Sequence, residues 1–198
     1  MNYRLRSFLT GFAVAVFLAA ARAGAADAGF EPLFNGRDFT GWRFSLQKTG
    51  DPWPENWKIK DGVIYLTGGA RPSLVTTREF GDFEVRFEWR ALKDKFNSGF
   101  YIRCKPDAGN NQIRVDKTYE GAFLGGKIDG AKAVPTMQKA VGEWNEWRVL
   151  VQGTKVTLWC NGKQAWEATG LTPERGHVGL QAEGSPLEFR NLQVRELK

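Results

Sequence analysis

Cysteine and histidine are scarce in this chain. Of 198 residues, only Cys104 and Cys160 are cysteines, and His177 is the single histidine. This scarcity argues against a disulfide framework and against a zinc site built from cysteine or histidine. Two buried free thiols are favoured, and one Cys104–Cys160 bridge is the alternative if the protein is exported. We expect no cofactor; a divalent metal stays open, although no dense acidic loop points to one.

Long apolar runs are also lacking, with one exception at the N-terminus. Residues 8–21 are mostly apolar, Arg4 and Arg6 precede them, and the small residues Ala23-Gly24-Ala25 follow. This order is typical of a secretory signal peptide. The run is short for a membrane span, so a retained anchor is the less favoured alternative. We predict a signal peptide over residues 1–25 and a periplasmic or secreted bacterial protein.

The remaining residues, 26–198, are enough for one domain with a good core and too few for two. The formal charge of the whole chain is +6, but Arg4, Arg6 and Arg22 leave with the signal. The other charges alternate in sign, as in the segment 83–90, which indicates a solvated strand face. We therefore expect no nucleic-acid partner and no stable membrane insertion, and the oligomeric state stays open.

No window of helical length keeps an apolar stripe at the 3.6-residue period. Short β-branched and aromatic runs alternate instead with Gly, Pro, Asn and Asp, which is an all-β pattern. We expect a two-sheet antiparallel β-sandwich of jelly-roll type. The predicted strands are 57–59, 63–66, 73–76, 83–91, 99–104, 112–116, 146–152, 155–160, 163–169, 177–182 and 187–196.

Local patterns orient several of these strands. In residues 83–90 the apolar side chains share one face and the charged side chains the other, as in an antiparallel sheet with one open side. Gln152-Gly153-Thr154 and Asn161-Gly162 then predict two successive tight hairpins.

An ordered series of short motifs resembles a known family. The motifs include Phe34–Trp42 (FNGRDFTGW), Trp57–Gly62 (WKIKDG), Glu88-Trp89-Arg90, Asn97-Ser98-Gly99 with Arg103, and Glu188–Asn191 (EFRN). Together they resemble the 3-keto-disaccharide hydrolase domain family. The resemblance implies a concanavalin A-like lectin/glucanase sandwich with a concave polar face, and hydrolysis of glycosides whose sugar is oxidised at carbon 3. One motif departs from the family pattern, because residues 110–116 lack its tyrosine and glutamate.

The two-residue period of a strand places several polar side chains on the open side. If the strands concerned are neighbours in one sheet, we expect these side chains to share one hollow. The predicted catalytic residues are Glu88, Arg103 and Asp116, and the predicted substrate-binding residues are Asn97, Tyr101, Gln112, Gln181 and Glu183. For Asn97, together with Ser98 and Gly99, a turn that leads into a strand is the favoured alternative. For Glu84 and Arg86 we expect only a cross-strand ion pair.

The chemistry follows from the substrate that the resemblance implies. An ordinary glucanase of this fold carries two carboxylates in an E-x-D-x-x-E strand, and the chain has no such string. A 3-keto sugar has an acidic hydrogen on carbon 2, so the site needs one carboxylate base, an oxyanion stabiliser and an acid for the leaving oxygen. We expect Glu88 or Asp116 as the base, Arg103 as the stabiliser, and Gln112 or Gln181 for positioning. The alternatives are a non-catalytic carbohydrate-binding module and an envelope adhesion or scaffold protein.

Overall fold

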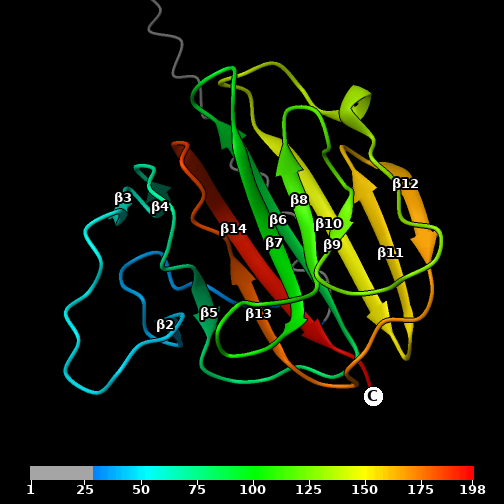
Figure 1. The fold of residues 1–198 in the computed structure, drawn as a ribbon, viewed down its shortest axis with the longest axis horizontal. Coiled ribbons are helices and arrows are strands. Elements are labelled where there is room, and N and C mark those ends of the chain that lie inside the picture. Colours follow the sequence, from blue (N-terminus) through cyan, green and yellow to red (C-terminus); the bar gives the residue numbers. More distant parts are fainter. Residues whose placement is uncertain (1–28) are drawn as a thin grey trace, which may run out of the picture.

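The computed structural model describes residues 29–198 and folds them into two antiparallel sheets that face each other (Figure 1). Sheet A has eight strands in the order β12-β11-β10-β6-β14-β4-β3, with β1 paired to β14. Sheet B has six strands in the order β2-β5-β13-β7-β8-β9. This is the expected all-β sandwich. The predicted signal peptide, residues 1–25, lies outside the described residues.

The strand bounds define both sheets. In sheet A they are Glu31–Pro32 (β1), Trp57–Lys60 (β3), Val63–Leu66 (β4), Phe83–Ala91 (β6), Asn145–Gln152 (β10), Lys155–Cys160 (β11), Lys163–Ala168 (β12) and Leu187–Glu196 (β14). In sheet B they are Trp42–Phe44 (β2), Leu74–Thr76 (β5), Asn97–Cys104 (β7), Gln112–Asp116 (β8), Phe123–Leu124 (β9) and His177–Leu180 (β13).

Strands β4, β6, β8, β11 and β14 begin and end where the sequence predicts. The short strands β1, β2 and β9 were not predicted, because two or three residues are too few to show a period. Within residues 29–198 the only helix is a 3-10 turn at Pro135–Met137. No helix in this part of the chain is long and apolar enough to cross a membrane.

The core lies between the sheets and follows the alternation in the sequence. Phe87 and Trp89 of β6 are each 1% exposed, and Phe100 of β7 is fully buried. The rings of Phe87 and Phe100 lie 4.6 Å apart and join the two sheets. Both predicted hairpins are present: Gly153 turns β10 into β11 with φ of 56°, and Asn161-Gly162 turns β11 into β12 with φ of 51° and 78°. Positive φ at both residues is what a type I′ hairpin requires.

The two cysteines are free and buried, as favoured. Cys104 pairs with His177 in sheet B, whereas Cys160 pairs with Trp147 in sheet A. Burial raises the pKa of the Cys104 thiol to about 12. Burial also raises the pKa of the Cys160 thiol, so neither cysteine favours the reactive thiolate form.

A carboxyl group is enclosed in the core near Cys160. Glu120 is fully buried and accepts a 3.1 Å hydrogen bond from Nε1 of Trp147. Burial raises the pKa of Glu120 to about 7, although the bonds from Trp147 and Cys160 act in the opposite direction. Glu120 is therefore a buried acid that keeps its proton over much of the acidic range.

This buried acid predicts a pH-dependent loss of stability. The folded protein holds the proton of Glu120 up to about pH 7, whereas the unfolded chain loses it near the ordinary pKa of 4.5. The contribution of Glu120 is thus most favourable below pH 4.5 and is lost as the pH rises to about 7, by about 3 kcal/mol in total. Urea denaturation across this range should show the decline, and the Glu120→Gln variant should lack it. An identical pH profile in the variant would contradict the prediction.

Candidate functional site

The structure does not bring the predicted site residues together. Strand β6, which carries Glu88, belongs to sheet A, whereas β7, β8 and β13 belong to sheet B. The expected single hollow with Glu88, Arg103, Gln112 and Asp116 is therefore wrong. The two-residue period of a strand determines on which side of the sheet a residue lies. It does not determine which of the two sheets the strand joins.

Arg103 is buried at the end of the sandwich and does not face the open side. Its side chain is 1% exposed and donates to the carbonyls of Gly81 at 2.8 Å and Gly153 at 2.7 Å. It also forms a 2.7 Å ion pair with Asp82, and its φ of 42° breaks the alternation of β7. Burial lowers the pKa of Arg103, and the negative charge of Asp82 acts in the opposite direction. These contacts of Arg103 join loops from both sheets. The role of Arg103 in the fold is therefore structural.

We expect Arg103→Ala to lower the free energy of unfolding by about 3 kcal/mol or more, because the variant loses a buried guanidinium that binds Asp82 and the carbonyls of Gly81 and Gly153. Urea denaturation measures the loss. The control is Arg175→Ala at a nearby exposed arginine that donates to the carbonyl of Glu79, where we expect a loss below about 1 kcal/mol. Equal losses in the two variants would contradict the assignment.

Three of the predicted binding residues do meet, on sheet B. Nε2 of Gln112 donates to Oε1 of Gln181 at 2.7 Å, and Nε2 of Gln181 donates to Glu183 at 3.1 Å. Gln112 also covers Gly99 so closely that a Cβ there would clash with it. Tyr101 is only 5% exposed beside them. Gln112, Gln181 and Glu183 therefore form a hydrogen-bonded row.

Asp116 and Asn97 lie at the end of the same sheet, where they pair in register between β7 and β8. Asp116 accepts 2.7 Å hydrogen bonds from the backbone N–H groups of Thr118 and Tyr119. It also forms a 2.7 Å ion pair with Arg114. Asn97 begins β7 and is part of the strand, so the alternative of a turn at this residue is wrong. The Asp116 carboxylate holds the turn after β8.

The outer face of sheet A carries alternating charges on β6 and β14. Glu188 lies opposite Arg90, and Arg190 lies opposite Glu88. Nε of Arg90 donates to Glu188 at 2.5 Å, and Nε of Arg190 donates to Glu88 at 2.7 Å. Each carboxylate of one strand therefore holds an arginine of the other strand in place.

A bulge in β14 adds one more donor. The register with β6 shifts between Arg190 and Gln193, and Asn191 has a φ of 53°. In this conformation Nδ2 of Asn191 donates to Glu88 at 2.6 Å. Bulges redirect side chains in this way. Glu88 thus accepts bonds from Arg190 and Asn191 together.

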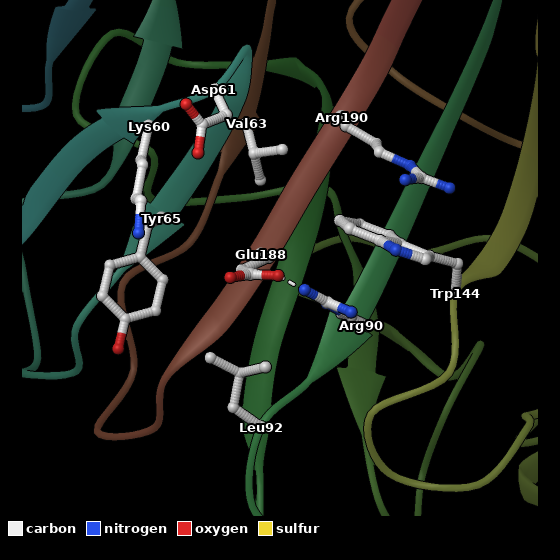
Figure 2. A pocket seen from close by; sticks show the side chains of 9 residues that line it. All are labelled: Lys60, Asp61, Val63, Tyr65, Arg90, Leu92, Trp144, Glu188 and Arg190. Carbon is white, nitrogen blue, oxygen red and sulfur yellow. Dashed lines mark hydrogen bonds and ion pairs between the residues drawn. The ribbon is translucent and has the colours of Figure 1, made fainter.

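Trp144 completes a hollow beside these ion pairs. The guanidinium carbon of Arg90 is 4.5 Å from the centroid of the Trp144 ring, and that of Arg190 is 3.9 Å away. Figure 2 shows Trp144 between the two guanidinium groups, with Glu188 beside Arg90 and the side chains of Lys60 and Tyr65 across the opening. The hollow, here called the Trp144 hollow, measures about 610 Å³. It is lined by Lys60, Asp61, Val63, Tyr65, Arg90, Leu92, Trp144, Glu188 and Arg190.

Within the Trp144 hollow, Glu188 has one oxygen to spare. Oε2 accepts the bond from Arg90, whereas Oε1 accepts none from any of the residues 29–198. The Glu188 side chain is 18% exposed, so the spare oxygen can meet a ligand. The hollow therefore combines one available carboxylate oxygen with two fixed cations.

A second charged cluster lies further along the same face. Glu84 has a side chain that is 1% exposed and pairs with Arg86 at 3.0 Å, Arg148 at 2.5 Å and Arg195 at 2.6 Å. The expected cross-strand ion pairing is confirmed for Glu84, which binds Arg148 of β10 and Arg195 of β14, whereas its pair with Arg86 lies within β6. Burial lowers the pKa of Arg86, and the positive charges of Arg148 and Arg195 lower it further.

In the described part of the chain, no group of three or more His, Cys, Asp and Glu side chains is placed to hold a metal ion. The Trp144 hollow has Asp61 and Glu188 as its acidic lining residues, and Glu188 is already paired with Arg90.

Family membership follows from the sequence as a whole. Residues 29–195 match the family described as the 3-keto-alpha-glucoside-1,2-lyase-like domain. The chain belongs to this family. The match covers both sheets, and the resemblance in the short motifs is confirmed.

Relatives of this 3-keto-alpha-glucoside-1,2-lyase-like domain agree with the fold. The chain is 25% identical over 231 residues to a protein named 3-keto-disaccharide hydrolase from Bacteroides thetaiotaomicron, over 85% of this chain and 79% of that protein. The crystal structure of a putative glycosyl hydrolase from Parabacteroides distasonis matches with a TM-score of 0.67 and 21% identity, over 86% of this chain and 94% of that chain. A β-glucanase from Bacillus licheniformis matches with a TM-score of 0.58 and 15% identity, over 85% and 97%. The two structures support the lectin/glucanase-like sandwich.

Sequence reasoning missed most of the lining of the Trp144 hollow. Trp144, Arg90, Glu188 and Arg190 were not among the predicted site residues. The signal was present, because Glu88-Trp89-Arg90 and the segment 188–191 are family motifs. What the motifs could not show is that the two segments are neighbouring strands, which only the pairing of β6 with β14 reveals.

Proposed function

We propose that this protein cleaves the glycosidic bond of a glycoside whose sugar is oxidised at carbon 3, by elimination and subsequent hydration, in the Trp144 hollow. The observation that carries the proposal is the spare oxygen of Glu188 beside two fixed arginines. Family membership and the name of the Bacteroides relative support the choice of substrate.

In the first step, Oε1 of Glu188 takes the hydrogen from carbon 2, and the electron pair of that C–H bond forms an enolate with the carbon 3 oxygen. A positioned base of this kind needs to lie within hydrogen-bond reach of its proton. Arg190, fixed by Glu88 and Asn191, faces the hollow and stabilises the negative charge on the enolate oxygen. Glu88 thus positions the arginine, while Glu188 acts as the base.

In the second step, the enolate returns to the ketone, a double bond forms between carbons 1 and 2, and the bond from carbon 1 to the leaving oxygen breaks. Lys60 or Tyr65, across the hollow, donates the proton that this oxygen needs (Figure 2). Water then adds to the double bond, with its oxygen on carbon 1 and a proton on carbon 2. The products are a free 3-keto sugar and the released aglycone.

The proposal is tested with paired substrates. The protein is incubated with p-nitrophenyl glucoside and with its 3-keto form, and the released nitrophenol is measured. We expect release above the uncatalysed rate from the 3-keto form only, because the unoxidised sugar has no acidic hydrogen on carbon 2. Equal release from both would contradict the elimination route. Binding of the 3-keto form without release would favour the carbohydrate-binding module instead.

The proposal places this activity outside the cytoplasm. Export through the predicted signal peptide requires cleavage after Ala25, so the mature protein should begin at Ala26. Mass spectrometry of the protein from periplasm or medium measures the N-terminus. A protein that keeps Met1 and stays in the cytoplasm would contradict the proposed localisation.

A further inference from the structure

Tyr65 and Glu188 lie beside each other on neighbouring strands of sheet A. Tyr65 of β4 is paired in register with Glu188 of β14, and Glu188 is paired in turn with Arg90 of β6. The residues before and after Tyr65 and Glu188 are buried, so both side chains project from the outer face of the sheet. Side chains paired in this way have Cβ atoms about 4.5–5.5 Å apart. Tyr65 is therefore the neighbour of the proposed base on the side away from Arg90.

The carboxylate of Glu188 is turned so that its spare oxygen faces the Tyr65 side of the hollow. Oε2 of Glu188 is held by Nε of Arg90. Figure 2 shows the other oxygen at the opposite end of the carboxylate, on the side where Tyr65 lies. In a sugar whose carbon 2 hydrogen meets this oxygen, carbon 1 is one bond away. The leaving oxygen on carbon 1 can then lie at Tyr65.

The hydroxyl of Tyr65 is free to meet a ligand. The Tyr65 side chain lines the Trp144 hollow and is partly buried. Its hydroxyl makes no hydrogen bond to any group of residues 29–198. A phenol can both donate and accept a proton. The fold therefore leaves the proton of Tyr65 for chemistry in the hollow.

Lys60 is placed less well for the same chemistry. It lies on the edge strand β3, where it is paired with Val63, so β4 separates it from Glu188. Its side chain is exposed. Holding a long exposed side chain in one position costs rotamer freedom, whereas tyrosine has only two side-chain torsions to fix.

We infer that Tyr65 is the acid that protonates the leaving oxygen, and that its phenolate then activates the water that adds to carbon 1. This role rests on the proposed function, since it assumes elimination from a 3-keto sugar with Glu188 as the base. It gives one residue both of the proton transfers at carbon 1.

The proton transfers balance over the two half-reactions. When the bond from carbon 1 to the leaving oxygen breaks, its electron pair stays on that oxygen, which takes the proton of Tyr65. Tyr65 is then a phenolate, and Glu188 holds the proton from carbon 2. In the hydration, the phenolate takes a proton from water, the water oxygen bonds to carbon 1, and an enolate forms again beside Arg190. Carbon 2 finally receives the proton of Glu188, so both side chains return to their starting states.

A series of leaving groups tests the acid role of Tyr65. The substrates are the 3-keto forms of p-nitrophenyl, phenyl and methyl glucoside with the same configuration at carbon 1. Nitrophenolate leaves without a proton in neutral water, whereas methanol needs one. We expect Tyr65→Phe to lower kcat/KM about 10²-fold or more for the methyl glucoside, and less than about 5-fold for the nitrophenyl glucoside. Chromatography of the released 3-keto sugar measures all three rates.

Two further variants locate the role. Tyr119→Phe removes the hydroxyl of an exposed tyrosine in the turn after β8, and it should leave all three rates unchanged. Lys60→Met keeps Tyr65, so it should not show the steep dependence on the leaving group. A steep dependence in Lys60→Met with none in Tyr65→Phe would overturn the inference and give the proton to Lys60. Near-ultraviolet circular dichroism shows that each variant is folded.

Proton NMR of the product, recorded before the sugar mutarotates, tests the second role of Tyr65. We expect retention of configuration at carbon 1, because water enters from the side that the leaving group left. Inversion would overturn the role of Tyr65 as the base for water. If the unaltered protein cleaves none of the three 3-keto glucosides, the proposed function fails, and the role of Tyr65 fails with it. If it cleaves them and Tyr65→Phe has the same dependence on the leaving group, the role of Tyr65 alone fails.

Discussion

Replacement of Glu188 by glutamine should lower kcat for aglycone release from a 3-keto glucoside by about 10²–10⁴-fold, the usual contribution of a positioned base. Glutamine keeps an acceptor for the bond from Nε of Arg90, so the hollow should keep its shape. It has no basic carboxylate, so the hydrogen on carbon 2 stays in place. Steady-state release of nitrophenol measures the effect, and KM should change far less than kcat.

The matched control is Glu183→Gln. Glu183 also accepts a hydrogen bond from a side chain, Gln181, but it follows β13 of sheet B. We expect near-normal turnover in this variant. A Glu183→Gln variant as impaired as Glu188→Gln would move the site to sheet B, where the sequence first placed most of its candidates.

Hydrogen exchange separates the role of Glu188 as a base from a structural role. In deuterated water, the unaltered protein should exchange the carbon 2 hydrogen of a 3-keto sugar that has no leaving group on carbon 1. The Glu188→Gln variant should not accelerate this exchange, although it still binds the sugar. Rapid exchange in the variant would show that another group removes the proton.

The fold was predictable because its signals are local. Residues 83–90 alternate between apolar and charged, and Asn161-Gly162 turns the chain sharply, so strand bounds and hairpins follow from neighbouring residues. The core position of Phe87 also follows, since the period fixes its face. These features need no knowledge of distant contacts.

The site was only partly predictable because it depends on pairing between distant segments. Glu88 is confirmed on an open face, yet its partner Arg190 comes from β14, 102 residues away. Arg103 was assigned to the open face from the two-residue period of a strand, but its φ is positive and its buried side chain binds backbone carbonyls. Trp144 precedes β10 in a loop, where no period applies.

A large effect on stability is also expected at Glu84, whose side chain is buried under the charged outer face of sheet A. Glu84→Gln removes the negative charge that Arg86, Arg148 and Arg195 share, and leaves three guanidinium groups close together. Breaking a buried ion pair costs about 3–5 kcal/mol. We expect about 3 kcal/mol, because the arginine side chains are about a third exposed and can turn towards water. Urea denaturation at neutral pH measures the loss.

The control for Glu84→Gln is Glu146→Gln, an exposed glutamate on the neighbouring strand β10, where we expect a change within about 0.5 kcal/mol. Salt gives an independent check, because screening weakens the repulsion among the three arginines. Adding salt should therefore restore part of the stability of Glu84→Gln and should affect Glu146→Gln less. A Glu84→Gln variant as stable as the unaltered protein at low salt would show that the arginines separate without cost and would contradict the prediction.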